Sequence, residues 1–213
     1  KNHQAKQFID FGNWTLLGKT LERTKASIYD SPIISTNKKY LSKVKQHLRK
    51  NKINKYKIVV EPAKRNTAPA ILSTALIKDI PDNQPLMFFT ADHLIEKMSI
   101  FNKAINKNKS NLNEENIFVF GIKPKSPTSD YGYFLSKKIK GNINKVTRFI
   151  EKPKETKAKQ IIKNKGYWNS GMFYLRKDSI INNFKKYQPK TYRNCVNACL
   201  LYTSPSPRDT LLS

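Results

Sequence analysis

Apolar positions along the chain follow two patterns that alternate. Short runs rich in β-branched and aromatic residues predict strands at residues 32–36, 56–60, 85–89, 117–122, 146–153 and 167–175. Between them, apolar residues recur at helical spacing and predict helices at residues 14–28, 39–50, 70–80, 154–166 and 178–187. Because strands and helices alternate, we expect an α/β fold with an open, mostly parallel sheet flanked by helices.

Length and hydropathy indicate one soluble domain. A chain of 213 residues is long enough to bury one α/β core and too short for two comfortable ones. No apolar run reaches membrane-spanning length, and residues 1–6 lead into no signal-peptide core. Cys195 and Cys199 lack a second cysteine pair or a nearby histidine, so we expect free thiols in a reducing compartment, the cytoplasm.

The balance of charges is strongly basic. Lysines and arginines number 41 against 15 aspartates and glutamates, which gives a formal net charge of +26. Such a charge is typical of proteins that bind nucleic acids or anionic surfaces. The lysines, however, are scattered along predicted helices and loops, with no dense block and no alternation with aromatic residues. We interpret them as a solvated surface that helps to attract phosphate-bearing substrates.

The loop after the strand at residues 56–60 carries the first candidate site. It contains Glu61, Arg65, Asn66 and Thr67, and it leads into the helix predicted at residues 70–80. Ligands of open α/β sheets collect at the carboxyl ends of strands, where this loop lies. A carboxylate there can accept two hydrogen bonds from adjacent donors, such as N1–H and N2–H2 of guanine. The alternative is a solvated strand-end charge at Glu61 and a simple helix cap at Thr67.

A second candidate follows the strand at residues 85–89, where the sequence continues Thr-Ala-Asp-His. The carboxylate of Asp92 suits Mg²⁺, which needs only one or two protein carboxylates when phosphates fill the other positions. We expect His93 to be structural, because one Asp-His pair makes neither a nucleophile with its base nor a zinc site.

Three further segments combine glycine or charged residues with aromatic ones. Gly132 lies between two tyrosines and permits close backbone approach to a ligand or, alternatively, a bulge. Glu151 and Lys152 end the strand predicted at residues 146–153 and would point to opposite faces if that strand stays regular. Residues 169–171, Asn-Ser-Gly, interrupt an apolar strand and suggest a bulge opened toward a ligand.

Residues 61–71, Glu-Pro-Ala-Lys-Arg-Asn-Thr-Ala-Pro-Ala-Ile, resemble the base-binding loop of bacterial mannose-1-phosphate guanylyltransferases, a branch of the sugar-nucleotide pyrophosphorylases. Other matches follow the family's order: Lys-Gln-Phe at residues 6–8, Ala-Asp-His at 91–93, Phe-Ile-Glu-Lys-Pro at 149–153 and Trp-Asn-Ser-Gly-Met-Phe at 168–173. The resemblance implies the Rossmann-like fold of the nucleotide-diphospho-sugar transferases.

The resemblance also implies roles and a reaction. The reaction joins GTP and α-D-mannose 1-phosphate into GDP-mannose and diphosphate with Mg²⁺ as cofactor. The implied catalytic residues that face phosphate are Lys6 and Lys152, and the implied Mg²⁺ ligand is Asp92. The implied nucleotide-binding residues are Glu61, Arg65, Asn66 and Thr67, and the implied mannose-binding residues are Gly132, Glu151 and Asn169. Ala5 replaces the family's usual proline, and without the resemblance Lys6 is an ordinary surface lysine.

The resemblance covers residues 1–198, which we expect to form an incomplete nucleotidyltransferase domain. The family's first strand with its Gly-rich phosphate loop and its second Mg²⁺-binding aspartate are not in this sequence, so we expect little or no turnover from it. Residues 199–213 contain no lysine or asparagine and include Ser-Pro repeats, which resembles translated sequencing adapter. We expect this tail to be non-native or, alternatively, disordered.

Two alternatives remain from the sequence. A related nucleotidyltransferase for another sugar or base would share Lys6, Asp92, Glu151 and Lys152 but should differ at residues 61–69. A basic nucleic-acid-binding module, the alternative that is not an enzyme, has only the net charge in its favour. We expect no membrane partner, and the sequence leaves the oligomeric state open, including a homo-oligomer.

Overall fold

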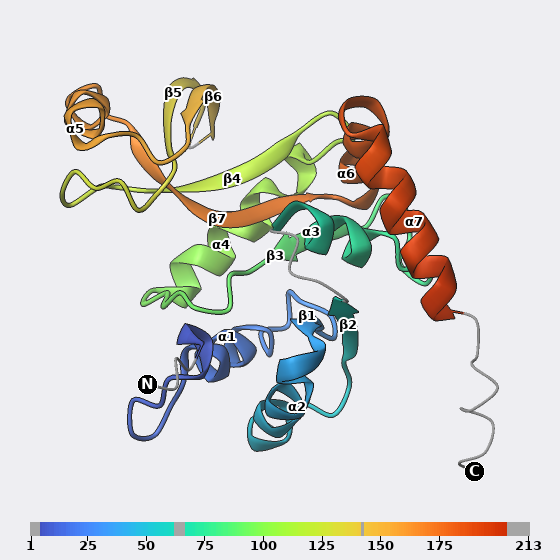
Figure 1. Ribbon diagram of the computed structural model, residues 1–213. Coiled ribbons are helices and arrows are strands. Elements are labelled where there is room, and N and C mark those ends of the chain that lie inside the picture. The colour runs from blue at the N-terminus through green and yellow to red at the C-terminus, as the bar shows by residue number, and fades with distance from the viewer. Residues whose placement is uncertain (1–4, 62–66, 142, 204–213) are drawn as a thin grey trace, which may run out of the picture. The chain divides into compact units, whose positions relative to one another are not determined.

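The computed structural model describes residues 5–61, 67–141 and 143–203, in two compact units (Figure 1). The first unit comprises residues 1–117 and 175–213, and the second comprises residues 118–174. In the described ranges, no helix is long and apolar enough to cross a membrane.

The first unit begins with a parallel strand pair and its helices. Its first elements are η1 (Lys6–Phe8), α1 (Leu16–Arg23), β1 (Ile33–Asn37), η2 (Lys38–Tyr40), α2 (Leu41–Lys50) and β2 (Lys57–Glu61). β1 and β2 pair in parallel, in a register that runs from Ile33 opposite Lys57 to Asn37 opposite Glu61. The strands predicted at residues 32–36 and 56–60 are therefore confirmed, each displaced by one residue.

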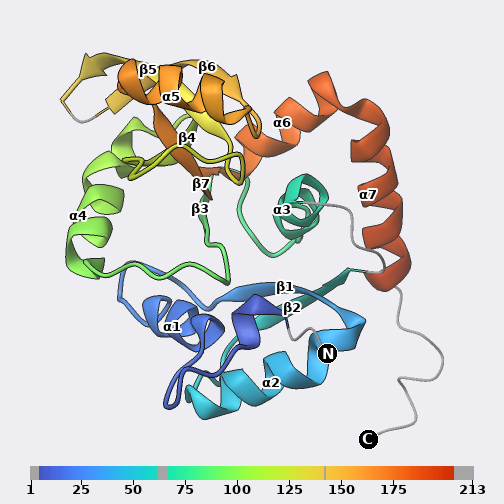
Figure 2. The same cartoon turned by 60° about the vertical axis from the view of Figure 1, so that its left-hand side comes forward.

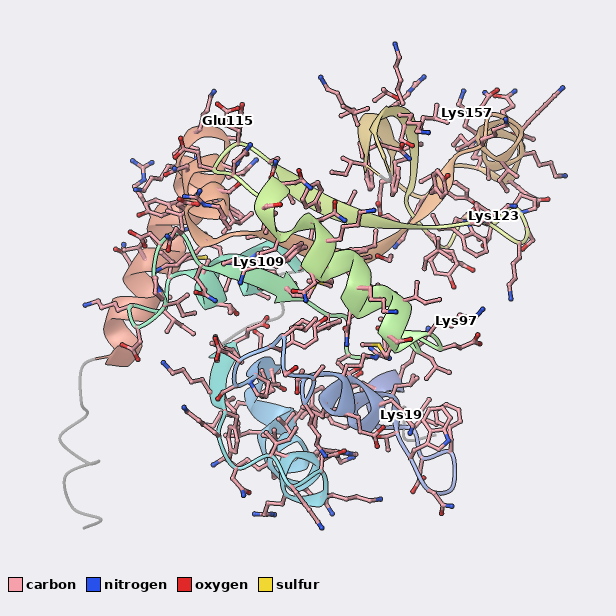
Figure 3. All side chains as sticks on the ribbon, turned by 180° about the vertical axis from the view of Figure 1, so that it is seen from behind. Lys19, Lys97, Lys109, Glu115, Lys123 and Lys157 are labelled. Atoms are coloured by element: carbon pink, nitrogen blue, oxygen red, sulfur yellow. The ribbon has the colours of Figure 1, made fainter. Side chains whose placement is uncertain are left out.

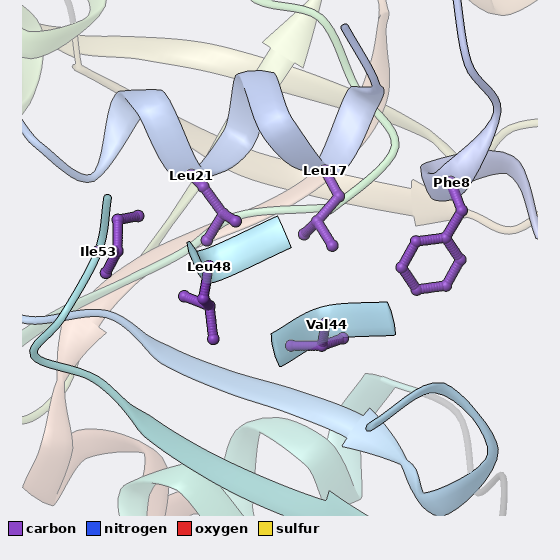
Figure 4. Packing of buried hydrophobic residues seen from close by; sticks show 6 residues of the cluster. All are labelled: Phe8, Leu17, Leu21, Val44, Leu48 and Ile53. Atoms are coloured by element: carbon purple, nitrogen blue, oxygen red, sulfur yellow. The ribbon is translucent and has the colours of Figure 1, made fainter. Parts of the chain in front are cut away.

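A hydrophobic core holds these elements together. It consists of Phe8, Leu17, Leu21, Val44, Leu48 and Ile53 (Figure 4). Helices α1 and α2 supply four of these side chains because both place leucine or valine four residues apart, on one helical face. Ile34 of β1 and Ile58 of β2 pack against the same cluster. The core thus fixes the carboxyl ends of β1 and β2 relative to α1.

Helix α1 ends earlier than the predicted residue 28. The hydroxyl of Thr15 accepts a hydrogen bond from the Gly18 N–H and caps the helix start. At the other end, the Thr24 hydroxyl donates to the Leu21 carbonyl at 2.8 Å, and the Thr24 N–H bonds the same carbonyl. Side-chain bonding of this kind competes with the helical ladder, so α1 closes at Arg23.

The first unit continues with α3 (Thr67–Ala75), β3 (Pro85–Phe88), α4 (Met98–Asn108), η3 (Lys109–Asn111), α6 (Lys177–Tyr187) and α7 (Pro189–Thr203). Helix α3 packs against both α6 and α7, in the angle that these two helices form (Figure 2). The predicted helix at residues 178–187 is confirmed as α6. Helix α3 starts at Thr67, three residues before the predicted residue 70, and ends at Ala75 rather than at residue 80.

The side chain of buried Lys177 binds the backbone that follows α3. Its ammonium donates to the carbonyls of Ile77 and Ile80 at 3.3 and 2.6 Å, and it lies 3.1 Å from the Asp82 carboxylate. These carbonyls point to a side chain of α6 instead of continuing the α3 ladder. The start of α6 is therefore bonded to the segment that leads into β3.

The second unit contains β4 (Ile117–Ile122), β5 (Tyr133–Lys140), β6 (Ile143–Ile150), α5 (Glu155–Lys163) and β7 (Tyr167–Arg176), of which β4 and β7 extend past the unit boundaries. β7 pairs with β4 and β5, and β5 pairs with β6. The β5–β6 and β5–β7 pairs are antiparallel. β5 and β6 are joined by residues 141–142 alone, and so short a connection permits only antiparallel pairing. The α/β class is confirmed; the parallel pairing that we expected occurs between β1 and β2.

Helix α5 ends at Lys163, three residues before the end of the helix predicted at residues 154–166. Lys165, with φ +57°, occupies the left-handed position, and its N–H bonds the Ile162 carbonyl at 2.9 Å. The N–H of Gly166 bonds the Ile161 carbonyl at 2.9 Å, which completes a Schellman motif. Gly166 is required for space, because a Cβ there would lie 2.3 Å from Cγ2 of Ile161.

Candidate functional site

The two units hold different groups of the candidate residues. The first unit carries Lys6, Glu61, Thr67 and Asp92, and the second carries Gly132, Glu151, Lys152 and Asn169. Arg65 and Asn66 lie outside the described residues.

Glu61 is the last residue of β2, and a serine of the neighbouring strand orients its side chain. The Ser35 hydroxyl donates to Oε1 of Glu61 at 2.5 Å. The Asn37 side-chain amide, also on β1, lies 3.5 Å from the Glu61 backbone carbonyl. An ionised carboxylate has about four acceptor positions, so Glu61 keeps acceptor capacity for a ligand. Sequence reasoning missed Ser35, because only the strand register brings it to Glu61.

Thr67 lies at the other end of the segment that follows Glu61. It is exposed and is the first residue of α3, so it stands inside the helix and not before it as a cap. Pro69 lies in the first turn, where its missing N–H costs the helix nothing. Residues 61 and 67 thus bracket the loop that resembles a base-binding segment.

Lys6 and Asp92 belong to segments that pack on one core. Ala5 and Ala91, the residues directly before them, both pack against the cluster around Leu17 and Leu48. Ile34, directly before Ser35, packs against it as well. The core therefore anchors the chain beside Lys6, Ser35 and Asp92, and the side chains of Lys6 and Asp92 are both exposed to solvent.

Asp92 offers one carboxylate to a metal. It lies in a turn after β3, with 45% of its side chain exposed, and its Oδ1 is 3.9 Å from Nε2 of His93. In the described part of the chain, no group of three or more His, Cys, Asp and Glu side chains gathers in the manner of a metal site. One exposed carboxylate fits an ion such as Mg²⁺ that takes most of its ligands from phosphate and water. It does not fit a metal held by protein ligands alone.

In the second unit, Gly132, Glu151 and Asn169 come together. The Asn169 N–H donates to the Gly132 carbonyl at 2.8 Å. A Cβ built on Gly132 would lie 2.8 Å from Oε2 of Glu151 and 2.9 Å from the Phe149 ring. Gly132 is thus needed for close approach, as its place between aromatic residues indicated, and the nearest side chain is the Glu151 carboxylate.

Local hydrogen bonds shape the polar interruption of β7. The Asn169 side-chain oxygen accepts from the Gly171 N–H at 3.3 Å, and the Ser170 hydroxyl accepts from the Met172 N–H at 3.2 Å. Gly171 has φ +71°, a conformation that suits glycine. Among the described residues, no group accepts a hydrogen bond from the Asn169 amide NH2. This segment therefore presents a donor group beside Gly132 and Glu151.

Aromatic residues to which the sequence analysis assigned no role support this cluster. The Tyr133 side chain is fully buried, and its hydroxyl bonds both the N–H and the carbonyl of Thr128 at 3.1 Å. The Trp168 ring lies 5.0 Å from the ring of exposed Tyr131. Tyr131 and exposed Phe149 thus add apolar surface near the polar groups, a combination that small-molecule sites share.

Glu151 and Lys152 are not part of a regular strand. β6 ends at Ile150, and both residues lie in the bend that follows. Our expectation that they point to opposite faces of a strand therefore does not apply. Lys152 has φ +41°, a left-handed conformation that costs a residue with a Cβ roughly 1–2 kcal/mol. Backbone strain of this kind concentrates at functional sites. Buried Pro153 follows directly and holds the bend against the unit.

Comparison with known families and curated proteins gives concordant matches. A family model described as nucleotidyl transferase matches residues 2–200. The alginate biosynthesis protein AlgA of Pseudomonas fluorescens is 34% identical over 197 residues, which cover 90% of this chain and 41% of that protein. Mannose-1-phosphate guanylyltransferase 2 of Escherichia coli O157:H7 is 36% identical over 204 residues, covering 89% and 42%. The chain thus spans about two fifths of the length of these relatives.

Solved structures share the fold. A Helicobacter pylori crystal structure titled mannose-6-phosphate isomerase superposes with a TM-score of 0.81 at 30% identity, over 92% of this chain and 75% of that one. A Thermus thermophilus crystal structure titled mannose-1-phosphate geranyltransferase gives a TM-score of 0.79 at 22% identity, over 94% and 59%. The second likeness bears on the fold alone.

Proposed function

Because this chain belongs to the nucleotidyl transferase family, we propose that the protein transfers a guanylyl group from GTP to α-D-mannose 1-phosphate. The products are GDP-mannose and diphosphate. The observation that carries the proposal is the convergence of Gly132, Glu151 and Asn169 in the second unit, which offers donors and acceptors suited to sugar hydroxyls. Relatives named for this reaction, at about one-third identity, support the choice of substrates.

The chemistry needs no covalent enzyme intermediate. A phosphate oxygen of the sugar phosphate attacks the α-phosphorus of GTP, a new P–O bond forms, and the bond to the bridging oxygen of the β-phosphate breaks. Diphosphate leaves with that electron pair. Catalysis then consists of holding the two phosphates in line and neutralising their charge. Both tasks suit exposed lysines at fixed backbone positions, and we assign them to Lys6 on η1 and Lys152 in the strained bend.

Base selection is assigned to the carboxyl end of β2. The Glu61 carboxylate accepts from N1–H and N2–H2 of guanine, while Ser35 holds its other side in place. Adenine lacks this donor pair, so bound ATP would leave the acceptor positions that Ser35 does not fill without a donor, which lowers affinity. Arg65, Asn66 and Thr67 complete the proposed nucleotide contacts, as the resembling loop implies.

The proposed metal is Mg²⁺, held by Asp92 together with nucleotide phosphates. When bound, it would neutralise charge on the phosphates and polarise the reacting phosphoryl group. Since Asp92 is the only carboxylate assigned to the ion, we expect tight metal binding only with nucleotide present. The exposed position of Asp92 leaves room for those phosphates.

The sugar contacts are assigned to the second unit. Glu151 accepts from mannose hydroxyls, the Asn169 amide donates to one, and the backbone at Gly132 allows close approach. The exposed faces of Tyr131 and Phe149 would pack against the apolar face of the sugar ring. The same geometry suits other hexose 1-phosphates, so a relative specific for another sugar or base is the second candidate. A substrate panel separates the two.

A nucleic-acid role has less support. The lysines labelled in Figure 3 lie in different parts of the chain: Lys19 on α1, Lys109 on η3, Lys157 on α5, and Lys97 and Lys123 in loops. Such scatter favours a solvated surface over a basic track. Steeply salt-dependent binding to duplex DNA would instead support the hypothesis that the protein binds nucleic acid.

Calorimetric titration of the chain with individual substrates tests the proposal. We expect GTP to bind at least about tenfold more tightly than ATP, and mannose 1-phosphate more tightly than free mannose. Glu61→Ala should remove the preference for GTP without changing the affinity for mannose 1-phosphate. Equal affinity for GTP and ATP, or no binding of either sugar compound, would contradict the assignment.

A further inference from the structure

Arg23, the last residue of α1, has no part in the contacts assigned above. Only 5% of its surface is exposed. Burial of a guanidinium is costly unless its N–H groups are hydrogen-bonded, and here desolvation lowers the pKa of Arg23 from its ordinary value. A buried arginine therefore needs specific partners, which show what it holds.

The partners of Arg23 are neutral oxygens. Its Nη2 donates to the backbone carbonyl of His93, and its Nη1 donates to the Thr20 hydroxyl at 3.2 Å. Among the described residues, no carboxylate forms an ion pair with Arg23. A charged donor on a backbone carbonyl makes a strong hydrogen bond. Arg23 thus fixes the backbone at residue 93.

Thr20, one turn earlier on α1, reaches the same segment. Its hydroxyl donates to the Leu16 carbonyl at 3.0 Å and lies 3.4 Å from the carbonyl oxygen of Thr90. Side chains of α1 therefore contact the backbone on both sides of Asp92, at residues 90 and 93. Both contacts come from a helix that the core around Leu17 and Leu21 holds in place.

The segment that carries Asp92 is irregular, and at its start the Phe89 ring packs against the rings of Tyr29 and Phe101. Residues 89–97 contain no helix or strand, and Leu94 is exposed. Ala91 packs on the core, but this contact alone does not fix the direction of the next residue. The bonds from Arg23 and Thr20 supply that constraint.

We propose that Arg23 is a positioning residue for Asp92: it fixes the turn at residues 90–93 so that the carboxylate meets the metal–nucleotide complex, without touching that complex itself. The inference rests on the metal role proposed for Asp92. A merely structural Arg23 would affect stability and turn mobility, whereas a positioning Arg23 also changes how strongly metal supports nucleotide binding. Interactions that orient a metal ligand typically change metal affinity by about 10–100-fold.

The variants follow from the surroundings of Arg23. A groove of about 290 Å³ borders the side chain, so truncation to alanine would enlarge it. Arg23→Met keeps the volume and removes the donors, and Arg23→Lys keeps one donor group and the charge. Arg49→Met on α2 is the matched control, since that arginine is exposed.

The first measurement is hydrogen–deuterium exchange of the protein without metal or substrate. We expect Arg23→Met to accelerate amide exchange at residues 90–96 by about tenfold or more, and Arg23→Lys to do so less. Exchange in β1 and β2 should stay unchanged, and Arg49→Met should match the wild type. Unchanged exchange at residues 90–96 in Arg23→Met would overturn the inference, whatever the substrate.

The second measurement is calorimetric binding of GTP with and without saturating Mg²⁺. Mg²⁺ should tighten GTP binding to the wild type. In Arg23→Met, this increase in GTP affinity should be about tenfold smaller. Asp92→Asn should lose it too, and the double variant should lose no more than Asp92→Asn alone. Additive losses would overturn the inference. An unchanged Mg²⁺ gain in Asp92→Asn would contradict the proposed metal role itself, a failure distinct from unchanged exchange.

Discussion

The Glu151 carboxylate occupies the space that a side chain on Gly132 would need. Its Oε2 lies 2.8 Å from the position of a Cβ at residue 132, and the Phe149 ring lies 2.9 Å from that position. Gly132 is also bonded through its carbonyl to the Asn169 N–H. The three residues assigned to the sugar are therefore sterically coupled, and one methyl group is enough to disturb them.

Gly132→Ala should weaken binding of mannose 1-phosphate by about tenfold or more, because the added Cβ must displace Glu151 or Phe149. Binding of GTP should remain, since its proposed contacts belong to the first unit. Titration calorimetry with each compound separates these effects. Gly141→Asn serves as the control, because a Cβ at Gly141 meets nothing within 4 Å and asparagine tolerates its φ of +56°. Equal loss in both variants would argue against the coupling.

Ser35→Ala should weaken GTP binding less than Glu61→Gln does. Ser35 only orients the carboxylate and makes no contact with the base, whereas Glu61→Gln removes the charge that accepts from guanine, and hydrogen bonds to a charged acceptor contribute about 1.5–3 kcal/mol each. The affinities of the two variants for GTP and ATP provide the comparison. Ser99→Ala is the control, because Ser99 is exposed on α4. A larger loss of GTP affinity in Ser35→Ala than in Glu61→Gln would indicate that the base binds elsewhere.

Lys177→Met should lower the free energy of unfolding by about 1–3 kcal/mol, because it leaves the carbonyls of Ile77 and Ile80 without their buried donor. Asp82→Asn should change stability by less than about 1 kcal/mol, since the Asp82 side chain is 83% exposed and water screens the pair. Urea unfolding of both variants tests this contrast. Similar losses in the two would show that the ion pair, and not the carbonyl contacts, stabilises the segment.

His47 should make stability fall in mild acid. Burial, assisted by Lys50, lowers the pKa of His47 from its ordinary value of 6.5. The unfolded chain therefore binds a proton at His47 more readily than the folded protein does. The stability that neutral His47 contributes is complete above pH 6.5 and is lost as the pH falls toward the pKa of His47 in the folded protein. Nδ1 of His47 also lies 3.3 Å from the hydroxyl of Thr15, the cap of α1. His47→Gln should flatten the dependence in urea unfolding between about pH 7 and pH 5. Equal slopes of the free energy of unfolding against pH in the wild type and in His47→Gln would contradict this reasoning.

Prediction from the sequence was most accurate for elements whose structure depends on their own residue types. The run at residues 117–122 is β4 with the same bounds, because β-branched and aromatic residues fill it. β5 was missed, since lysines 137 and 138 are exposed and its apolar pattern covers only the first residues. Helix ends shifted where a side chain took up backbone carbonyls, as the local Thr24 does at the end of α1 and the distant Lys177 does after α3.

Within the candidate site, residue types were predictable and partners were not. The role expected for Gly132, close approach, followed from its aromatic neighbours, but its contact with Glu151 depends on how β5 pairs with β6 and β7. Ser35 reaches Glu61 only through the parallel register of β1 and β2. Arg23 carried no signal in the sequence beyond its place on an amphipathic helix. Strand register and long-range contacts of this kind are set by tertiary packing.

Formation of GDP-mannose tests the central claim most directly. Protein expressed from the full gene that encodes this chain should be incubated with GTP, mannose 1-phosphate and Mg²⁺, and the nucleotides separated by chromatography. We predict equal amounts of GDP-mannose and diphosphate, and loss of both in Glu61→Ala and Asp92→Asn. Product from another nucleotide or another sugar phosphate, with none from GTP and mannose 1-phosphate, would contradict the account.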